Sequence, residues 1–348
     1  MKFKFKISQT GNFYFFIWNL SEWHFSCRPE VNYYWKTFSP TKSFKEELLL
    51  EKYLKKSANI FKKYEKEKGE VVFPVLAKAL KAKSKKDILN ELKGRDRIFM
   101  EKVFKVFETM FSFYWQESKP RLKKFIQLFA NPKVEKLIGK ALKILEIYFG
   151  KIDSKEITVY LLMIPQHFMG GGGANVGRNK ITVEIGNISP KGFRWSLITI
   201  LHEIAHVCFQ YHQSYFDNLL KEFLKSLNKQ EIKEINIDKI FDNDLITIFR
   251  EGITSSIISD GIIDDILFKT NTRKKLEFQL KNIDFIKTYP EGYFRKFMSY
   301  YLYPLNKKYL RQKRKIDKNY LKESLKLIKK FNKIYKKFNG YIRLYNFN

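Results

Sequence analysis

The sequence predicts a mostly helical α+β protein, and three observations support this prediction. In residues 43–150, Lys-rich segments place apolar residues three and four positions apart, which is the spacing of amphipathic helices. Two shorter runs, residues 157–165 and 180–186, are rich in β-branched residues and predict strands of a small sheet. The 348 residues are 44% hydrophobic and 17% aromatic, so the chain can bury a large core in one or two domains.

The first expected region, residues 1–150, is aromatic and helical and packs on the rest of the chain. Residues 1–7 alternate Lys with apolar residues as a strand does, and residues 13–38 are dense in aromatic side chains. Within the aromatic stretch, His24 and Cys27 are three positions apart, which is compatible with half of a metal site. Since no second pair follows, we expect both to be core residues.

A glycine loop separates the two predicted strands. Residues 157–165 are continuously apolar, whereas residues 180–186 alternate apolar with polar, as a half-exposed edge strand does. Glycines let another backbone approach closely, and an amide side chain can hydrogen-bond it. The candidate substrate-binding residues are therefore Gly172, Gly173, Ala174 and Asn175. A plain flexible hairpin loop is the alternative, whereas a phosphate-binding loop is disfavoured because no Gly-Lys-Ser/Thr and no helix follow.

Residues 197–211 predict a buried helix that carries two histidines and a glutamate, His202, Glu203 and His206, in the pattern H-E-x-x-H. Residues four apart lie on one face of a helix, so both imidazoles can face one metal ion. Burying these three side chains costs several kcal/mol unless they are paired, and a metal ion suits all three. A zinc ion lowers the pKa of its water to about 7, and Glu203 can then act as general base. The alternative is a core helix with hydrogen-bonded histidines.

Catalytic zinc usually takes three protein ligands, so a third ligand is expected further along the chain. His212 would complete a metzincin-like motif, but Phe209 stands where that motif needs Gly. Glu251 is the better candidate because residues 245–268 form a second apolar helical stretch, in which a carboxylate needs a reason to be buried. A paired helix carboxylate without metal remains the alternative for Glu251.

The H-E-x-x-H helix followed by Glu251-Gly252 resembles the gluzincins, zinc peptidases whose second helix supplies a glutamate ligand. The resemblance covers residues 157–300. It implies a zincin-like catalytic domain with a small mixed sheet whose edge strand precedes the H-E-x-x-H helix. It also implies one Zn²⁺ per chain, bound by His202, His206 and Glu251.

Gluzincin-like sites generally also carry a Tyr or His that hydrogen-bonds the tetrahedral oxyanion. No histidine follows His212 in this sequence, and Tyr293 opens an apolar segment late in the chain. The resemblance therefore implies Tyr293 as the oxyanion donor. A core aromatic residue is the alternative, since the chain holds 20 Tyr.

The formal net charge of +31 is typical of proteins that bind polyanions. Lys is spread along nearly every amphipathic segment, and residues 307–337 alternate basic with apolar residues at helical spacing. This segment could bind nucleic acid or an anionic membrane surface. A solvated helix that closes the domain is favoured over both.

These inferences give an expected organisation of three parts: residues 1–150, a zincin-like catalytic core at 151–305, and a basic C-terminal helix at 306–348. The expected activity is zinc-dependent hydrolysis of a peptide or protein substrate. The alternative is a basic nucleic-acid or membrane-surface binding protein with a vestigial or structural zinc site. Glu203 argues against the alternative, because a structural zinc site needs no general base.

A cytoplasmic location is expected from two further features of the sequence. The chain has only two cysteines, Cys27 and Cys208, which cannot form a disulfide framework. No apolar stretch is long enough to be expected to span a bilayer, and residues 1–7 do not lead into a signal-peptide apolar region.

Overall fold

The structure, a computed structural model, describes residues 1–24, 26–38, 44–66, 72–151, 155–210, 215–237, 240–241, 244–282, 286 and 289–345. The chain divides into two compact units. Unit 1 comprises Met1–Glu135 and Ser154–Glu203, and unit 2 comprises Lys136–Asp153 and Ile204–Asn348. Most of the described residues are helical, which confirms the predicted α+β class with helices in the majority. The division expected from the sequence, 1–150, 151–305 and 306–348, stays a prediction.

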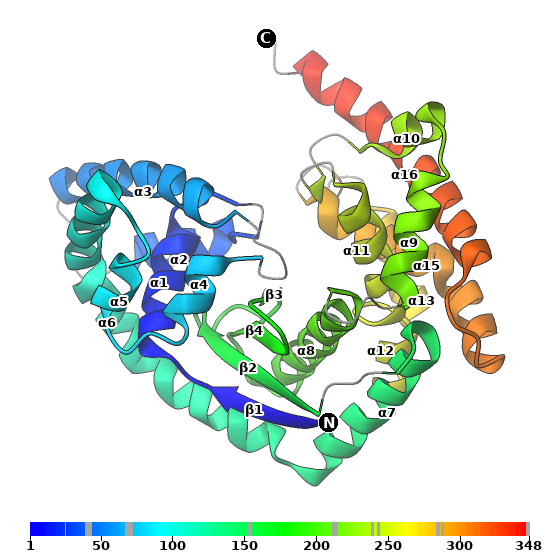
Figure 1. Cartoon of the computed structure of the whole chain (residues 1–348), viewed down its shortest axis with the longest axis horizontal. Coiled ribbons are helices and arrows are strands. Elements are labelled where there is room, and N and C mark those ends of the chain that lie inside the picture. The colour runs from blue at the N-terminus through cyan, green and yellow to red at the C-terminus, as the bar shows by residue number, and fades with distance from the viewer. Residues whose placement is uncertain are drawn as a thin grey trace. The chain divides into compact units, whose positions relative to one another are not determined.

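Unit 1 contains a four-stranded mixed sheet. Its strands are β1 (Lys2–Lys6), β2 (Glu156–Met163), β3 (Gly173–Asn175) and β4 (Lys180–Ile185). The order across the sheet is β1-β2-β4-β3, as Figure 1 shows. Strands β1, β2 and β4 are parallel to one another, and β3 is antiparallel to β4. The expected strands at both ends of the glycine loop are present.

Strand β4 is an interior strand, which corrects the expectation that residues 180–186 form a half-exposed edge. The edge is β3, which belongs to the glycine loop itself. The alternating pattern misled because the polar residues of β4 are buried as well. Thr182 donates a hydrogen bond of 3.4 Å to the Ala174 carbonyl, and Glu184 pairs with Arg28 at 3.2 Å. The polar residues of β4 therefore alternate with apolar ones because they have hydrogen-bond partners inside the protein, and not because they face solvent.

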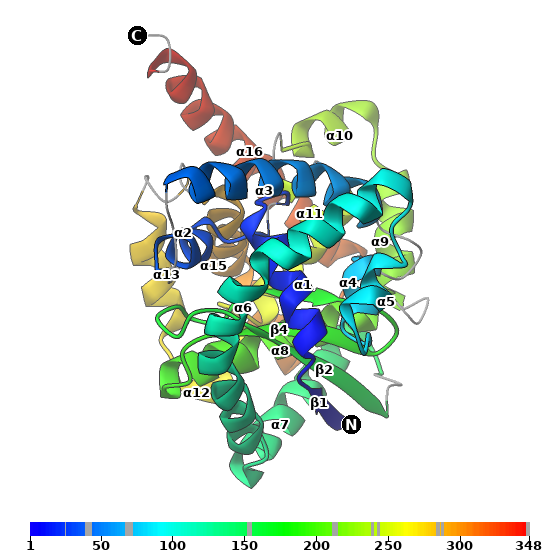
Figure 2. The same ribbon diagram turned by 90° about the vertical axis from the view of Figure 1, so that its left-hand side faces the viewer.

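The helices of unit 1 surround a strongly aromatic core. They are α1 (Gln9–Leu20), α2 (Pro29–Thr37), α3 (Phe44–Tyr64), α4 (Pro74–Ala79), α5 (Lys85–Leu89) and α6 (Gly94–Phe129). Helix α1 is buried from Gly11 to Leu20, as expected of a helix that is apolar on all sides, and it contacts α3, α4 and α6 (Figure 2). Cys27 is buried, and His24 lies against the rings of Trp18, Trp23 and Phe73.

Two helices continue across the division between the units: α7 (Pro132–Phe149) and α8 (Pro190–Gln210). The remaining helices belong to unit 2. They are α9 (Tyr215–Lys225), α10 (Lys229–Ile235), α11 (Leu245–Ile257), α12 (Ile262–Phe268), α13 (Thr272–Leu280), α15 (Pro290–Arg311) and α16 (Lys318–Tyr345). Helices α11 and α15 pack closely, because Gly252 admits the Phe294 ring and the Met298 side chain where a Cβ would stand 3.1–3.2 Å from them.

Two helical stretches differ from their expected extent. Residues 245–268 form two helices, because a turn at Gly261 brings its backbone so close to the Ser256 carbonyl that a side chain would not fit. The basic segment 307–337 covers the end of α15 and most of α16, with a turn between them in which Lys313 adopts a positive φ of 48°. In the described part of the chain, no helix is long and apolar enough to cross a membrane.

A buried carboxylate joins α1, α3 and α4 in unit 1. Glu65, which directly follows α3, is 3% exposed and accepts the Tyr14 hydroxyl at 2.7 Å. It also accepts the backbone N–H groups of Val75 at 3.0 Å and Leu76 at 2.9 Å, at the start of α4. Burial raises the pKa of the Glu65 carboxyl to about 7, although these three hydrogen bonds oppose the rise.

Stability should therefore depend on pH through Glu65. The contribution of Glu65 to the free energy of unfolding is fully present below about pH 4.3, the ordinary pKa of an unfolded glutamate. It is lost as the pH rises through about 7. We expect the free energy of unfolding of the wild type to fall by about 3 kcal/mol relative to Glu65→Gln between these limits. Urea unfolding at a series of pH values measures this difference, with Glu101→Gln on the exposed face of α6 as control. A difference that does not change with pH would contradict the prediction.

Candidate metal centre

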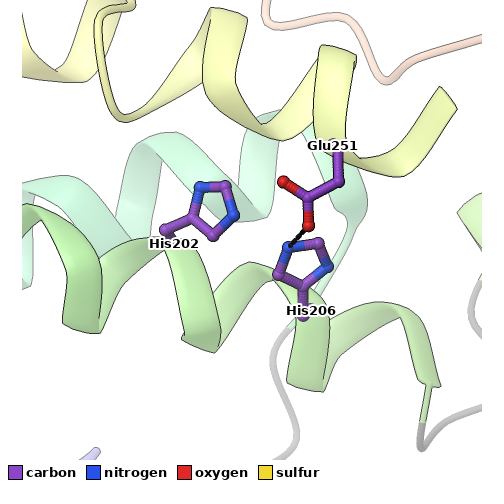
Figure 3. Close-up of side chains that lie close together, drawn as sticks. All are labelled: His202, His206 and Glu251. Carbon is purple, nitrogen blue, oxygen red and sulfur yellow. Dashed lines mark ion pairs between the residues drawn. The ribbon is translucent and has the colours of Figure 1, made fainter. Parts of the chain in front are cut away.

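Helix α8 presents two histidines on one side, toward a glutamate of α11. His202 and His206 stand one turn apart, and Figure 3 shows both rings on the side of α8 that faces Glu251. One donor atom from each of the three residues lies within 4.8 Å of those of the other two. His206 Nε2 and Glu251 Oε1 are 3.2 Å apart. The sequence-predicted ligands are therefore brought together in a group that could hold a metal ion.

The group is shielded from solvent. His202 is 9% exposed, and the side chains of His206 and Glu251 are 12% and 14% exposed. The neighbouring α8 residues Leu201, Ile204 and Ala205 are completely buried. Few water molecules can therefore compete for the two imidazoles and the carboxylate, and electrostatic attraction to a cation is stronger than at an exposed site.

Arg295 of α15 holds the second oxygen of the Glu251 carboxylate. Its Nε donates to Glu251 Oε2 at 2.9 Å, and its Nη1 donates to the Tyr289 hydroxyl at 3.4 Å. Burial by itself would lower the pKa of the Arg295 guanidinium, but the carboxylate of Glu251 raises it above its ordinary value. Arg295 therefore stays cationic and keeps Oε1 of Glu251 directed at His206. No pattern in the sequence indicated a role for Arg295.

Glu203 lies against the edge strand of the sheet in unit 1. It is 7% exposed. A Cβ added to Gly173 would stand 2.6 Å from its Cγ and 2.7 Å from its Oε1. Such distances are shorter than van der Waals contact allows, so a side chain at this position of β3 would force the Glu203 side chain or the strand to move. The predicted general base and the predicted substrate-binding loop are thus in direct contact.

Strand β3 leaves one side of its backbone unpaired with β4. Glu184 N–H donates to the Gly172 carbonyl at 2.9 Å, and Val176 N–H donates to the Lys180 carbonyl at 2.9 Å. Backbone groups alternate along a strand, so those of Gly173 and Asn175 face away from β4. Strand β3 ends the sheet in the described part of the chain, and an extended segment could pair with this edge.

An ion pair beneath the glycine loop fixes its position. Arg28 Nη1 donates to Glu184 Oε2 at 3.2 Å and to the Met169 carbonyl at 2.9 Å. The same carboxylate oxygen accepts the Gly172 N–H at 3.1 Å. Burial raises the pKa of the Glu184 carboxyl, and Arg28 opposes part of that rise. Sequence reasoning missed both residues, although a glutamate inside a short β-rich run was the available signal.

The hydroxyl of Tyr293 is engaged with a backbone carbonyl. Its hydroxyl donates to the Leu280 carbonyl at 2.9 Å, the residue is 8% exposed, and burial raises its pKa. The assignment of Tyr293 as oxyanion donor stays a prediction. His212, the rejected third ligand, lies outside the described residues.

Comparisons with known proteins identify no related family. No family model, no curated protein and no solved structure matches it. The likeness to gluzincins therefore rests on the residues themselves: the H-E-x-x-H pattern and the group formed by His202, His206 and Glu251.

The contact between Gly173 and Glu203 can be tested with two neighbouring glycines. Gly173→Ala forces either β3 or the Glu203 side chain to move, and we expect it to lower the free energy of unfolding by about 1–3 kcal/mol. At Gly171 an added Cβ meets nothing within 4 Å. Gly171→Ala should therefore leave stability unchanged or raise it by up to about 1 kcal/mol. Chemical denaturation of both variants measures the difference, and equal effects would contradict the contact.

Proposed function

We propose that this chain is a zinc-dependent metallopeptidase. The observation that carries the proposal is the convergence of His202, His206 and Glu251 within 4.8 Å of one another, with the Glu203 carboxylate on the adjacent position of α8. Two histidines and a glutamate are a ligand set of catalytic zinc, which leaves a fourth position for water. A structural zinc site normally uses four protein ligands instead.

One pair of donor atoms has the spacing that two ligands of a zinc ion would have. Bonds of 2.0–2.2 Å in a tetrahedral arrangement place ligand atoms about 3.3 Å apart. The separation of 3.2 Å between His206 Nε2 and Glu251 Oε1 already has this value. Arg295 donates a hydrogen bond to Oε2 of Glu251, so Oε1 would be the oxygen that binds the ion. Zinc ligands in proteins are commonly oriented by such hydrogen bonds.

The chemistry of this chain's own residues follows from the position of Glu203. A zinc ion bound there would supply Lewis acidity toward water and toward a substrate carbonyl. The Glu203 carboxylate takes the proton of the attacking water and delivers it to the departing amine nitrogen. Because Glu203 touches β3, a peptide paired with that strand lies within reach of the base.

The substrate proposed for this site is an extended peptide segment of a peptide or protein. Gly173 would offer its outward backbone N–H and C=O to it, as in other cases of strand addition to a sheet edge, and Asn175 lies on the same side of β3. Gly172 and Ala174 would keep β3 in register with β4, and the pair of Arg28 with Glu184 would hold the loop beneath them.

Zinc binding is the first test. The purified protein should bind about one Zn²⁺ per chain, and His202→Ala and His206→Ala should each weaken binding by at least about tenfold, as is usual on loss of a ligand or its support. His167→Ala is the matched control, because His167 is exposed and lies outside the group. Metal analysis and competition with a chromophoric chelator give the stoichiometry and affinity. A folded protein that takes up no zinc would refute the proposal.

The second test concerns the general base. Glu203→Gln should keep the zinc but lower kcat/KM for peptide hydrolysis by about 10²–10⁴, because the amide fills the same space and cannot accept the proton. Glu222→Gln, an exposed change on α9, serves as control for the assay on a diverse peptide library. If both wild type and Glu203→Gln are inert while the protein binds nucleic acid or anionic vesicles with steep salt dependence, the basic binding protein is the better description.

A further inference from the structure

A hollow in unit 2 is lined by cationic side chains of two neighbouring helices. It has a volume of about 470 Å³ and lies between α13 and α15. Arg273 contributes from α13, and Lys307, Lys308 and Arg311 contribute from the last two turns of α15. Volumes of about 300–1,000 Å³ are typical of pockets that bind small molecules.

The four cations that line the hollow, like the nearby Lys274 and Lys313, form no ion pair with an acidic residue that the structure describes. In the part of the chain that the structure describes, no carboxylate oxygen lies within 4.0 Å of any of them. By contrast, Lys275 and Lys296 both pair with Asp260, and Lys329 of α16 pairs with Glu234. The carboxylate of Asp265 accepts the hydroxyl of Tyr303, which also lines the hollow, and in the described part of the chain it forms no direct ion pair with these four cations.

Two of the four cations are held in place by aromatic rings. Lys307 Nζ lies 5.0 Å from the centroid of the Tyr303 ring, and the Arg273 guanidinium carbon lies 5.5 Å from that of Tyr300. Cation–π contacts orient a charge without neutralising it. The positive groups therefore remain available on the wall of the hollow. Because the rings already restrict two of these side chains, less conformational entropy is lost when a ligand binds.

We propose that this hollow binds a ligand that carries two or more phosphate groups, either free in solution or as the headgroup of a lipid. Four like charges around one hollow repel one another, and a multivalent anion removes that repulsion while it forms charge-assisted hydrogen bonds. The guanidinium groups match phosphate oxygens in pairs, and the lysines add point charges. The proposal is independent of the metal centre, since none of these residues belongs to that group.

Two triple variants with the same change in charge separate a specific site from the general effect of a basic protein. The first replaces three cations of the hollow, Arg273→Gln, Lys307→Gln and Arg311→Gln. The second replaces three exposed lysines of α16 that lie outside it, Lys322→Gln, Lys333→Gln and Lys337→Gln. All six side chains are exposed, so both variants should fold, and circular dichroism verifies this.

Isothermal titration with inorganic tripolyphosphate is the measurement. We expect the hollow variant to bind at least about tenfold more weakly than wild type, and the α16 variant less than about twofold, because each lost charge-assisted contact weakens binding severalfold whereas distant exposed charges are screened. Equal losses in the two variants, or no binding by the wild type, would overturn the proposal.

Vesicles then distinguish the two sources of phosphate. Phosphatidylcholine vesicles that contain a phosphatidylinositol bisphosphate are compared with phosphatidylserine vesicles of equal surface charge. Preferential binding to the former that is lost in the hollow variant supports a lipid headgroup. Tripolyphosphate binding without vesicle binding supports a free ligand. Equal binding of wild type and hollow variant to both kinds of vesicle, together with equal tripolyphosphate affinity, would leave no specific site in the hollow.

Discussion

The burial of ionisable groups in apolar surroundings is the constraint on which the rest of this structure depends. Helix α8 places His202, Glu203 and His206 among residues that are almost completely buried. A buried charge or imidazole is tolerated only with partners. Glu251 of α11 approaches His206, and Arg295 of α15 in turn holds Glu251. The close packing of α11 on α15 is thus required by electrostatics as well as by apolar contact.

The same constraint shapes the sheet. Glu184 lies on β4 between two other strands, where an unpaired carboxylate would be costly. Arg28 and the Gly172 N–H supply the missing partners, and in doing so they position the loop that becomes β3. One buried acidic residue therefore links the N-terminal aromatic region to the edge of the sheet within unit 1.

The sequence predicted the candidate site correctly where a local pattern of residues determines which side chains meet. The H-E-x-x-H spacing, the buried helix around it and a carboxylate in a second apolar helix together predicted which three residues meet. The sequence failed where the deciding contact is distant along the chain. Arg28 and Glu184 are 156 residues apart, and among 67 Lys and Arg residues no pattern distinguishes the one that pairs. The assignment of residues 180–186 to an edge failed because the polar side chains of that strand have partners inside the protein. The apolar helical stretch over 245–268 is divided by a local feature instead, the tight turn at Gly261, which the apolar pattern did not reveal.

The absence of a side chain at Gly173 has a consequence for selectivity under the proposed function. A strand edge that offers only backbone groups at this point recognises what every peptide has in common. Discrimination between substrates must then come from side chains further from the scissile bond, and changes in those side chains could alter preference without disturbing the base. The residues that select a substrate and the residue that activates water would in that case be separate parts of one site, and Gly173 would lie between them.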